Sequence, residues 1–325
     1  MGNGSLGLGM RVEQDPTIVH QTTGAASGTG ADPGGSVKGM RTLVFAHRGS
    51  SKAYAENTRA AYMQALADGA DGIECDIHLS ADGFVVCHHD PTVDRTSNSS
   101  GRIGEKTLEE LKSLDFSSWR NPEIPAAYGQ LHDQFLTLGE LIELMKDAGP
   151  GVGLAVEIKH PSPFGRQLEE AMFTELESLG WNSGTSMLGD IQVSFMSFDP
   201  GSVRFMMDRV SAEHICQLVT EVDEQWIEEL CEAGETDKAG VAAVLAQAMT
   251  EGAELLSSGE PQLAGPGVAY MRKHPRLTDQ WLARGATFRV WTVDDPRDAT
   301  YLVERGVAQL TSNVPALIKE HLGIA

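Results

Sequence analysis

Short apolar runs alternate with longer amphipathic segments along most of this chain, beginning at residue 42. Each run has the length of a buried strand. The runs are residues 42–47, 71–77, 153–159, 190–195, 214–219, 253–257, 287–293 and 307–312. We therefore predict eight strands.

Between most of these runs, apolar residues recur at helical spacing, and several segments end in Gly, a common helix stop. The clearest helical segments are residues 56–69, 136–149, 164–180, 200–210 and 295–306. Eight strands, each followed by helix-forming sequence, predict parallel βα units that close into a (β/α)8 TIM barrel. A doubly wound open sheet is the alternative, but no Gly-x-Gly-x-x-Gly motif follows the first strand to support it.

One segment interrupts the alternation. Ala-Asp-Gly at 81–83 lies between two extended runs and predicts a β-hairpin. The returning run leads into polar, turn-rich sequence with one expected helix at 107–115. We therefore expect residues 80–135 to form a small insertion between the second strand and its helix.

The hairpin brings acids and histidines together. With the turn at 81–83, Asp76 lies opposite His88, and His89 lies beside Glu74 and Asp76; a slip by one residue is the alternative register. Residues 74 and 76 point to the same side of their strand, toward the interior of a barrel. Paired buried carboxylates are costly without a compensating proton or cation, and hard divalent cations prefer oxygen ligands.

Other predicted strands end in reactive residues. His47 and Arg48 end the first strand, Glu157 and Lys159 lie on one side of the third, and "WTVDD" ends the seventh. Barrel active sites lie at the carboxyl ends of the strands. We therefore expect these residues to meet at one mouth.

Composition narrows the chemistry further. The formal net charge of −21 disfavours nucleic acid and anionic lipid as partners. An anionic substrate would then need a local positive device, such as a metal ion or an Arg. The four cysteines form no CxxC pair and are expected to be reduced thiols. The oligomeric state stays open.

The N-terminal segment and the lengths of the apolar runs indicate the domain boundaries and the cellular location to expect. Residues 1–38 are rich in Gly, Ser, Thr and Ala and predict a flexible tail before a barrel at 39–325. No signal segment or membrane-spanning run is recognised, so a cytoplasmic protein without stable membrane insertion is expected.

The motifs in order, "FAHRGS", "AENT", "GIECDIHLSADGFVVCHHDP", "AVEIK", "VSFMSFDP" and "VWTVDDP", resemble the glycerophosphodiester phosphodiesterases. The resemblance runs from about residue 42 to residue 315. It implies a TIM barrel with an insertion after the second strand. It also implies hydrolysis of glycerophosphodiesters to sn-glycerol 3-phosphate and an alcohol, with one divalent cation: Ca²⁺ or Mg²⁺, with Mn²⁺ as a third candidate.

The same resemblance implies roles for individual residues. His47 and His89 match the general acid/base pair, and His89 is preferred to His88 because the motif places His directly before Asp, here Asp90. A cyclic phosphate intermediate is part of this expectation. The implied metal ligands are Glu74, Asp76 and Glu157. The implied substrate-binding residues are Arg48, Lys159, Glu56, Phe198 and Trp291.

Two regions depart from the family pattern. "TSNVP" at 311–315 places Asn313 where many members have Asp, and residues 221–252 match no motif. The acidic run 221–230 is expected to be a solvated helix face, and Trp226, like His78 and His160, is expected to be structural.

Two other functions remain as alternatives. A lysophospholipase D-like phosphodiesterase would need an apolar groove, which the sequence does not reveal. A catalytically silent barrel acting as a binding module would have lost a histidine or a carboxylate, and none is lost here.

Overall fold

The computed structural model describes residues 41–324 except 122, 148, 150 and 233–236. The predicted tail at 1–38 therefore lies outside the described residues. The strands are β1 Leu43–His47, β2 Gly72–Leu79, β3 Val85–Cys87, β4 Gly153–Ile158, β5 Trp181–Asn182, β6 Met187–Leu188, β7 Ile191–Ser197, β8 Ile215–Val219, β9 Leu263–Pro266, β10 Thr287–Val290 and β11 Gln309–Ser312. The α-helices are α1 Arg59–Ala67, α2 Leu108–Lys112, α3 Leu138–Asp147, α4 Gln167–Ser178, α5 Pro200–Met207, α6 Glu224–Glu232, α7 Lys238–Ser258, α8 Val268–Lys273, α9 Pro275–Ala283, α10 Pro296–Glu304 and α11 Pro315–Leu322. Short 3₁₀ helices are η1 Ile103–Glu105, η2 Ala126–Tyr128, η3 Leu131–Asp133 and η4 Ala212–His214.

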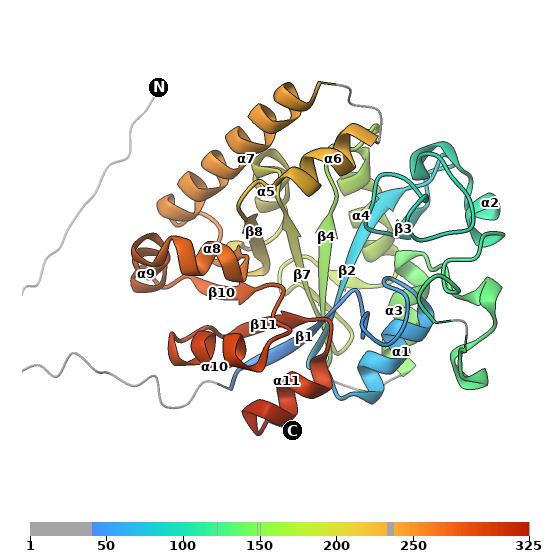
Figure 1. Ribbon diagram of the computed structural model, residues 1–325, viewed down its shortest axis with the longest axis horizontal. Coiled ribbons are helices and arrows are strands. Elements are labelled where there is room, and N and C mark those ends of the chain that lie inside the picture. Colours follow the sequence, from blue (N-terminus) through green and yellow to red (C-terminus); the bar gives the residue numbers. More distant parts are fainter. Residues whose placement is uncertain (1–40, 122, 148, 150, 233–236, 325) are drawn as a thin grey trace, which may run out of the picture. The chain divides into compact units, whose positions relative to one another are not determined.

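Eight parallel strands close into a barrel in the described part of the chain, as the sequence predicts. The barrel order is β1, β2, β4, β7, β8, β9, β10 and β11, and β1 pairs with both β2 and β11 to close the ring. Helices surround these strands (Figure 1). The five clearest predicted helical segments correspond to α1, α3, α4, α5 and α10. Among the described helices, none is both long enough and apolar enough to cross a bilayer.

One predicted strand is wrong. Residues 253–257 lie inside α7, and the sixth barrel strand is instead β9, Leu263–Pro266. Ala, Glu and Leu are strong helix formers, whereas the Gly and Pro of β9 have the appearance of a turn. Gly265 is needed here because a Cβ would lie 2.5 Å from the Leu218 side chain and 2.8 Å from Cys216 Sγ. Because close packing against β8 requires glycine at this position, β9 lacks the run of large apolar residues by which a buried strand is recognised.

The hairpin register agrees with the sequence prediction. Ile77 pairs with Cys87 and Leu79 with Val85 in antiparallel register, and the His88 amide donates to the Asp76 carbonyl at 3.0 Å. Residues 80–135 hold β3, α2 and the first three 3₁₀ helices before α3 begins. A small apolar cluster holds this segment together: Val86, Val93, Ile103, Leu111, Phe116 and Phe135.

The barrel interior closes around Phe45 of β1. Its ring fills the space that a side chain at Gly72 would need, since a Cβ there would lie 2.2 Å from Phe45 Cε1. The Arg289 guanidinium lies over the Phe45 ring, 4.4 Å from the ring centroid. Arg289 is buried, and its Nη2 donates to Ser194 Oγ at 3.0 Å. The Phe45 and Arg289 side chains thus occupy this part of the barrel interior.

We expect Gly72→Ala to lower the free energy of unfolding by about 1–3 kcal/mol, because the added methyl group overpacks against Phe45. The double variant Phe45→Leu/Gly72→Ala should be more stable than the sum of the two single effects predicts, since leucine makes room. Urea unfolding followed by circular dichroism measures all three variants. Strictly additive effects would show that the ring does not impose glycine at position 72.

Candidate active site

The end of β1 turns sharply and directs Arg48 across the mouth. Arg48 has a positive φ of 56°, and Gly49 follows with φ 83°, where a Cβ would lie 2.5 Å from the backbone of Ala61. The Arg48 amide donates to Glu74 Oε2 at 2.8 Å. Its guanidinium binds Glu56 Oε1 at 2.9 Å and lies 3.1 Å from Asp76 Oδ2. The turn thus joins Arg48 to three acids, two through the guanidinium and one through the backbone amide.

Three carboxylates meet beneath this arginine. Glu74 and Asp76 come from β2, and Glu157 comes from β4, in register with Asp76. All three are buried, and each offers an oxygen within 4.8 Å of the others. Glu74 Oε1 and Asp76 Oδ1 have no hydrogen-bond partner among the described residues. Asp76 Oδ1 is contacted only by the Lys159 ammonium, at 3.3 Å, so Glu74 Oε1 is the one without either kind of partner. Buried oxygens from three carboxylates are the donor set that a hard divalent cation takes.

The pKa shifts express the same shortage of positive charge. Burial, together with Asp76 and Glu157, raises the pKa of Glu74 well above its usual value. Burial and Asp76 likewise raise the pKa of Glu157, although Lys159 opposes the shift. Asp76 differs: burial raises its pKa, but Lys159 and Arg48 outweigh burial and lower it. A cation among these oxygens would allow all three to ionise.

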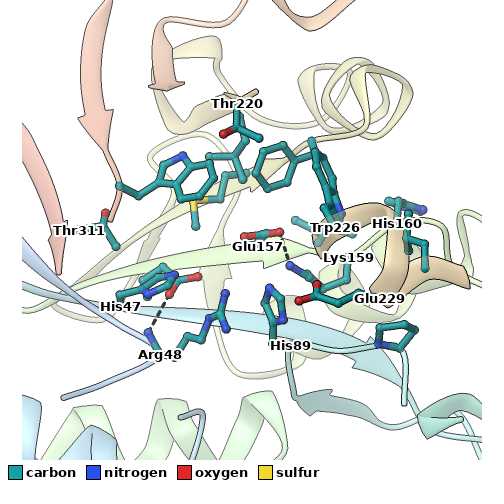
Figure 2. Close-up of a pocket in the computed structure, with 18 of the residues that line it drawn as sticks. His47, Arg48, His89, Glu157, Lys159, His160, Thr220, Trp226, Glu229 and Thr311 are labelled. Atoms are coloured by element: carbon teal, nitrogen blue, oxygen red, sulfur yellow. Dashed lines mark hydrogen bonds and ion pairs between the residues drawn. The ribbon is translucent and has the colours of Figure 1, made fainter. Parts of the chain in front are cut away.

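Lys159 completes the charged floor from the end of β4. Its Nζ donates to Glu157 Oε1 at 2.7 Å and lies 3.3 Å from Asp76 Oδ1. Glu157 and Asp76 raise its pKa although burial lowers it, so the ammonium stays charged. Arg48 and Lys159 therefore present two fixed cations beside the carboxylates. Figure 2 shows both at the pocket floor, near Glu157.

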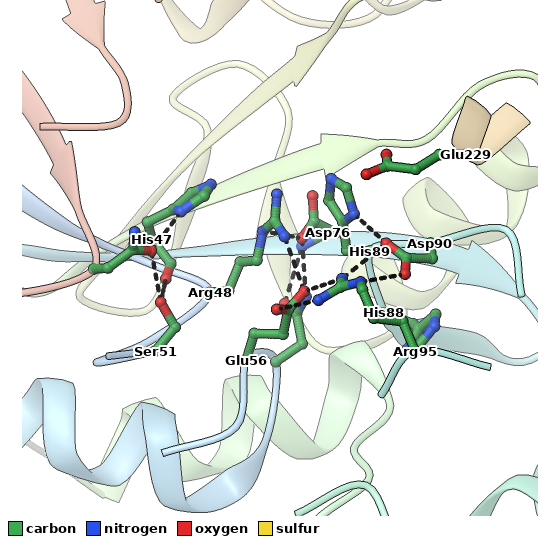
Figure 3. Close-up of polar contacts among 12 residues, drawn as sticks. His47, Arg48, Ser51, Glu56, Asp76, His88, His89, Asp90, Arg95 and Glu229 are labelled. Carbon is green, nitrogen blue, oxygen red and sulfur yellow. Dashed lines mark hydrogen bonds and ion pairs between the residues drawn. The ribbon is translucent and has the colours of Figure 1, made fainter. Parts of the chain in front are cut away.

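A second group of acids is already neutralised. Glu56, His89 and Asp90 also lie within 4.8 Å of one another. Arg95, however, binds Glu56 through Nη1 and Nη2 at 2.9 and 2.7 Å, and Asp90 through Nε and Nη2 at 2.7 and 2.9 Å (Figure 3). These bidentate pairs leave the group poorly suited to a cation. Glu56, expected to bind substrate, thus lies behind Arg48 and pairs with two arginines.

His47 is held through an amide. Its Nδ1 lies 2.8 Å from Asn313 Oδ1, and Asn313 Nδ2 donates to Asp294 Oδ2 at 2.7 Å. Because Asn313 donates through its nitrogen, its oxygen must accept, so His47 Nδ1 carries the proton. Nε2 is then left with a free lone pair. Burial and Arg48 lower the pKa of His47 to about 4, which favours this neutral form.

His89 is held through a carboxylate instead. Its Nδ1 donates to Asp90 Oδ1 at 2.6 Å, which leaves Nε2 free in the same way. Burial, Arg48 and Lys159 lower its pKa to about 3. In Figures 2 and 3 the two imidazoles lie on either side of the Arg48 guanidinium. His88 points elsewhere: it bonds the Thr92 carbonyl at 2.9 Å and packs on Phe116.

These groups open into a pocket of about 260 Å³. Both histidines, Arg48, Lys159, Glu74 and Glu157 line it. Its opposite wall is aromatic: the Phe198 ring lies 5.4 Å from the Trp291 ring and 5.0 Å from the Trp226 ring, between centroids. Phe198 and Trp291, which the family resemblance implies as substrate-binding residues, therefore lie in this wall, across the pocket from the charged residues.

Several lining residues were not recognised from the sequence. Trp226 on α6, expected to be structural, forms part of the aromatic wall, and Glu229 of the supposedly solvated acidic face lines the same pocket. His78 and His160 also line it, although each is bonded to a neighbour: His78 to the His89 carbonyl, His160 to Glu169. Helical spacing of Trp226 and Glu229, three residues apart, was the available signal.

Comparisons with known proteins identify the family. The model of the "Glycerophosphoryl diester phosphodiesterase family" matches residues 47–317. The "Probable glycerophosphodiester phosphodiesterase 1" of Mycobacterium tuberculosis is 31% identical over 281 residues, 86% of this chain and 92% of that protein. The glycerophosphodiester phosphodiesterase of Caldanaerobacter subterraneus is 57% identical over 76 residues, 23% of this chain and 31% of that protein.

Solved structures share the barrel. A phosphodiesterase from Oleispira antarctica, solved with the product sn-glycerol-3-phosphate, superposes with a TM-score of 0.64 at 24% identity, covering 86% of this chain and 96% of that one. A glycerophosphodiester phosphodiesterase from Thermotoga maritima gives a TM-score of 0.59 at 21% identity, covering 86% and 98%. From the family match over most of its length, this chain belongs to the glycerophosphoryl diester phosphodiesterases.

Proposed function

We propose that this chain hydrolyses glycerophosphodiesters to sn-glycerol 3-phosphate and an alcohol, with one divalent cation. The observation that carries the proposal is the convergence of two imidazoles, each with a free Nε2, and two cations on three buried carboxylates. The name of the Mycobacterium tuberculosis relative supports the same substrate class. A cytoplasmic location stays a prediction from the sequence. A glycerol 3-phosphate assay with and without chelator tests the proposal directly.

The charged floor suits an anionic phosphodiester. Glu74, Asp76 and Glu157 would hold the cation, which when bound neutralises phosphate charge and acidifies a nearby hydroxyl. Arg48 and Lys159 donate hydrogen bonds to the phosphoryl oxygens, whose negative charge grows in the transition state. Because both cations are already fixed by ion pairs, little reorganisation is needed when the substrate binds.

The two histidines move the protons. One imidazole accepts a proton through Nε2 from the attacking hydroxyl, as a new P–O bond forms. The other, which takes up a proton at Nε2 when the anionic phosphate lies beside it, donates that proton to the departing alcohol oxygen as the second P–O bond breaks. Attack by the substrate's own glycerol 2-hydroxyl would give a cyclic phosphate and free alcohol. Water would then open the ring to glycerol 3-phosphate, with the histidines exchanging roles.

Removing one carboxylate should weaken cation binding without changing the fold. In wild type we expect Ca²⁺, Mg²⁺ or Mn²⁺ to raise the melting temperature by several degrees, since a ligand at 100 times its Kd stabilises by about 2.7 kcal/mol. Glu157→Gln should abolish most of this shift and the activity with it. Glu304→Gln on the exposed face of α10 is the matched control. A wild-type enzyme fully active in chelator would contradict this metal site.

Loss of either catalytic imidazole should cost on the order of 10² to 10⁴ in kcat. We expect the double variant His47→Ala/His89→Ala to lose much less than the product of the single losses, because the pair acts as a unit. A nitrophenyl ester should partly rescue only the variant that lacks the leaving-group acid, which assigns the two roles.

His88→Ala is the control for this pair. It removes the contacts to Thr92 and Phe116, so we expect lower stability with activity largely retained in the folded protein. If His88→Ala loses its activity and His89→Ala remains nearly as active as wild type, then His88, and not His89, transfers the proton.

Asn313 should act through His47. We expect Asn313→Ala to lower kcat about 10- to 100-fold, since residues that orient a functional imidazole usually contribute that much. KM and the cation-induced rise in melting temperature should change little, because Asn313 is not among the residues that line the catalytic pocket. A raised KM at unchanged kcat would show instead that this residue binds substrate.

A further inference from the structure

A groove lies beside the catalytic pocket, with a volume of about 620 Å³. One side is the face of α7 that carries Val241, Val244, Leu245 and Ala248, at helical spacing. Trp226 and Leu230 of α6 and Phe198 after β7 form the rest of its apolar lining, with Pro161 at one end. This volume falls within the range of sites for small organic ligands.

The groove and the catalytic pocket adjoin each other. Five residues line both: His160, Pro161, Phe198, Trp226 and Leu230. Phe198 and Trp226, whose ring centroids are 5.0 Å apart, form the shared wall. Figure 2 shows Trp226 and His160 on the side of the pocket near Lys159. An occupant of the groove could therefore be covalently joined to a group on the charged floor.

The polar groups in the groove wall are already engaged. Asp199 binds Arg166 at 2.6 Å, and Asp237 accepts from the Ala239 amide as the cap of α7. His160 bonds Glu169 at 2.9 Å. Val244, in contrast, is an apolar residue of the groove lining that is 69% exposed. What the groove offers a ligand is apolar surface, open to water and next to a site for a phosphodiester.

We propose that the groove between α6 and α7 binds a single long alkyl or acyl chain attached to the phosphodiester substrate. The inference rests on the proposed function, since the chain must be joined to a phosphodiester on the floor. Much of its lining comes from α6 and α7, in the region where the sequence shows no recognisable motif of the family. Two substrates share the required chemistry: one carries the chain on the leaving alcohol, the other on the glycerol.

Two series of substrates test this, each used below its critical micelle concentration so that membrane-like aggregates play no part. Glycerophosphoalkanols carry the chain on the alcohol, and 1-acyl-glycerophosphoethanolamines carry it on the glycerol. We expect kcat/KM to rise about two- to fourfold for each added methylene in one series, as expected for burial of apolar surface. The series that responds identifies which side of the phosphate enters the groove.

Two variants locate the effect. Val244→Glu places a charge in the groove on an exposed helix position, and Val241→Trp fills the space, so one works even if the other folds poorly. Both should flatten the dependence on chain length and leave hydrolysis of glycerophosphoethanolamine unchanged. Val303→Glu on α10, a half-exposed valine away from the groove, is the matched control.

The outcomes are distinct. No gain with chain length in wild type, or a gain that survives both variants, overturns the groove while hydrolysis of glycerophosphoethanolamine upholds the proposed function. If no substrate is hydrolysed, the proposed function fails. Calorimetric titration with glycerophosphooctanol then tests chain binding in the groove without hydrolysis. Binding that Val244→Glu weakens supports the proposal, and absence of binding overturns it.

Discussion

Repulsion among three buried carboxylates is the constraint around which the mouth of this barrel is arranged. Glu74, Asp76 and Glu157 lie on adjacent strands and cannot all ionise in a buried site without nearby positive charge. Arg48 and Lys159 supply part of it, and the Arg48 guanidinium, which follows a turn with positive φ, lies 3.1 Å from Asp76 Oδ2. Glu74 Oε1 has no hydrogen-bond partner among the described residues, which indicates that the two protein cations do not complete the balance.

A second layer of ion pairs keeps the first in place. Arg95 binds both Glu56 and Asp90, and Glu56 also pairs with Arg48. Asp90 is thereby fixed to accept from His89, and Glu56 to support Arg48. The insertion thus contributes more than His89. It also carries Arg95, whose ion pairs distinguish Glu56 and Asp90 from the three buried carboxylates.

The sequence predicted the parts that depend on local pattern. Strand-end residues and the Ala-Asp-Gly turn were enough to pair Asp76 with His88 and to place His89 near the acids, because the period of a strand is fixed. β9 could not be predicted, since tight packing requires Gly265 and so removes its apolar signal. The support of His47 by Asn313 and Asp294, and the face of Trp226 on α6, arise from contacts between segments far apart in the chain.

The two halves of the barrel carry different kinds of residue. Strands β1, β2 and β4 and the segment after β3 carry the charged groups and the two histidines, whereas the wall formed by Phe198, Trp226 and Trp291 follows β7, β8 and β10. At β9 the wall has no side chain of its own at Gly265, and the Trp291 indole covers the position by donating to the Gly265 carbonyl. Substitutions on one side can therefore alter which molecules fit while the reacting groups stay unchanged. Such a separation lets a lineage explore new substrates gradually, without passing through inactive intermediates.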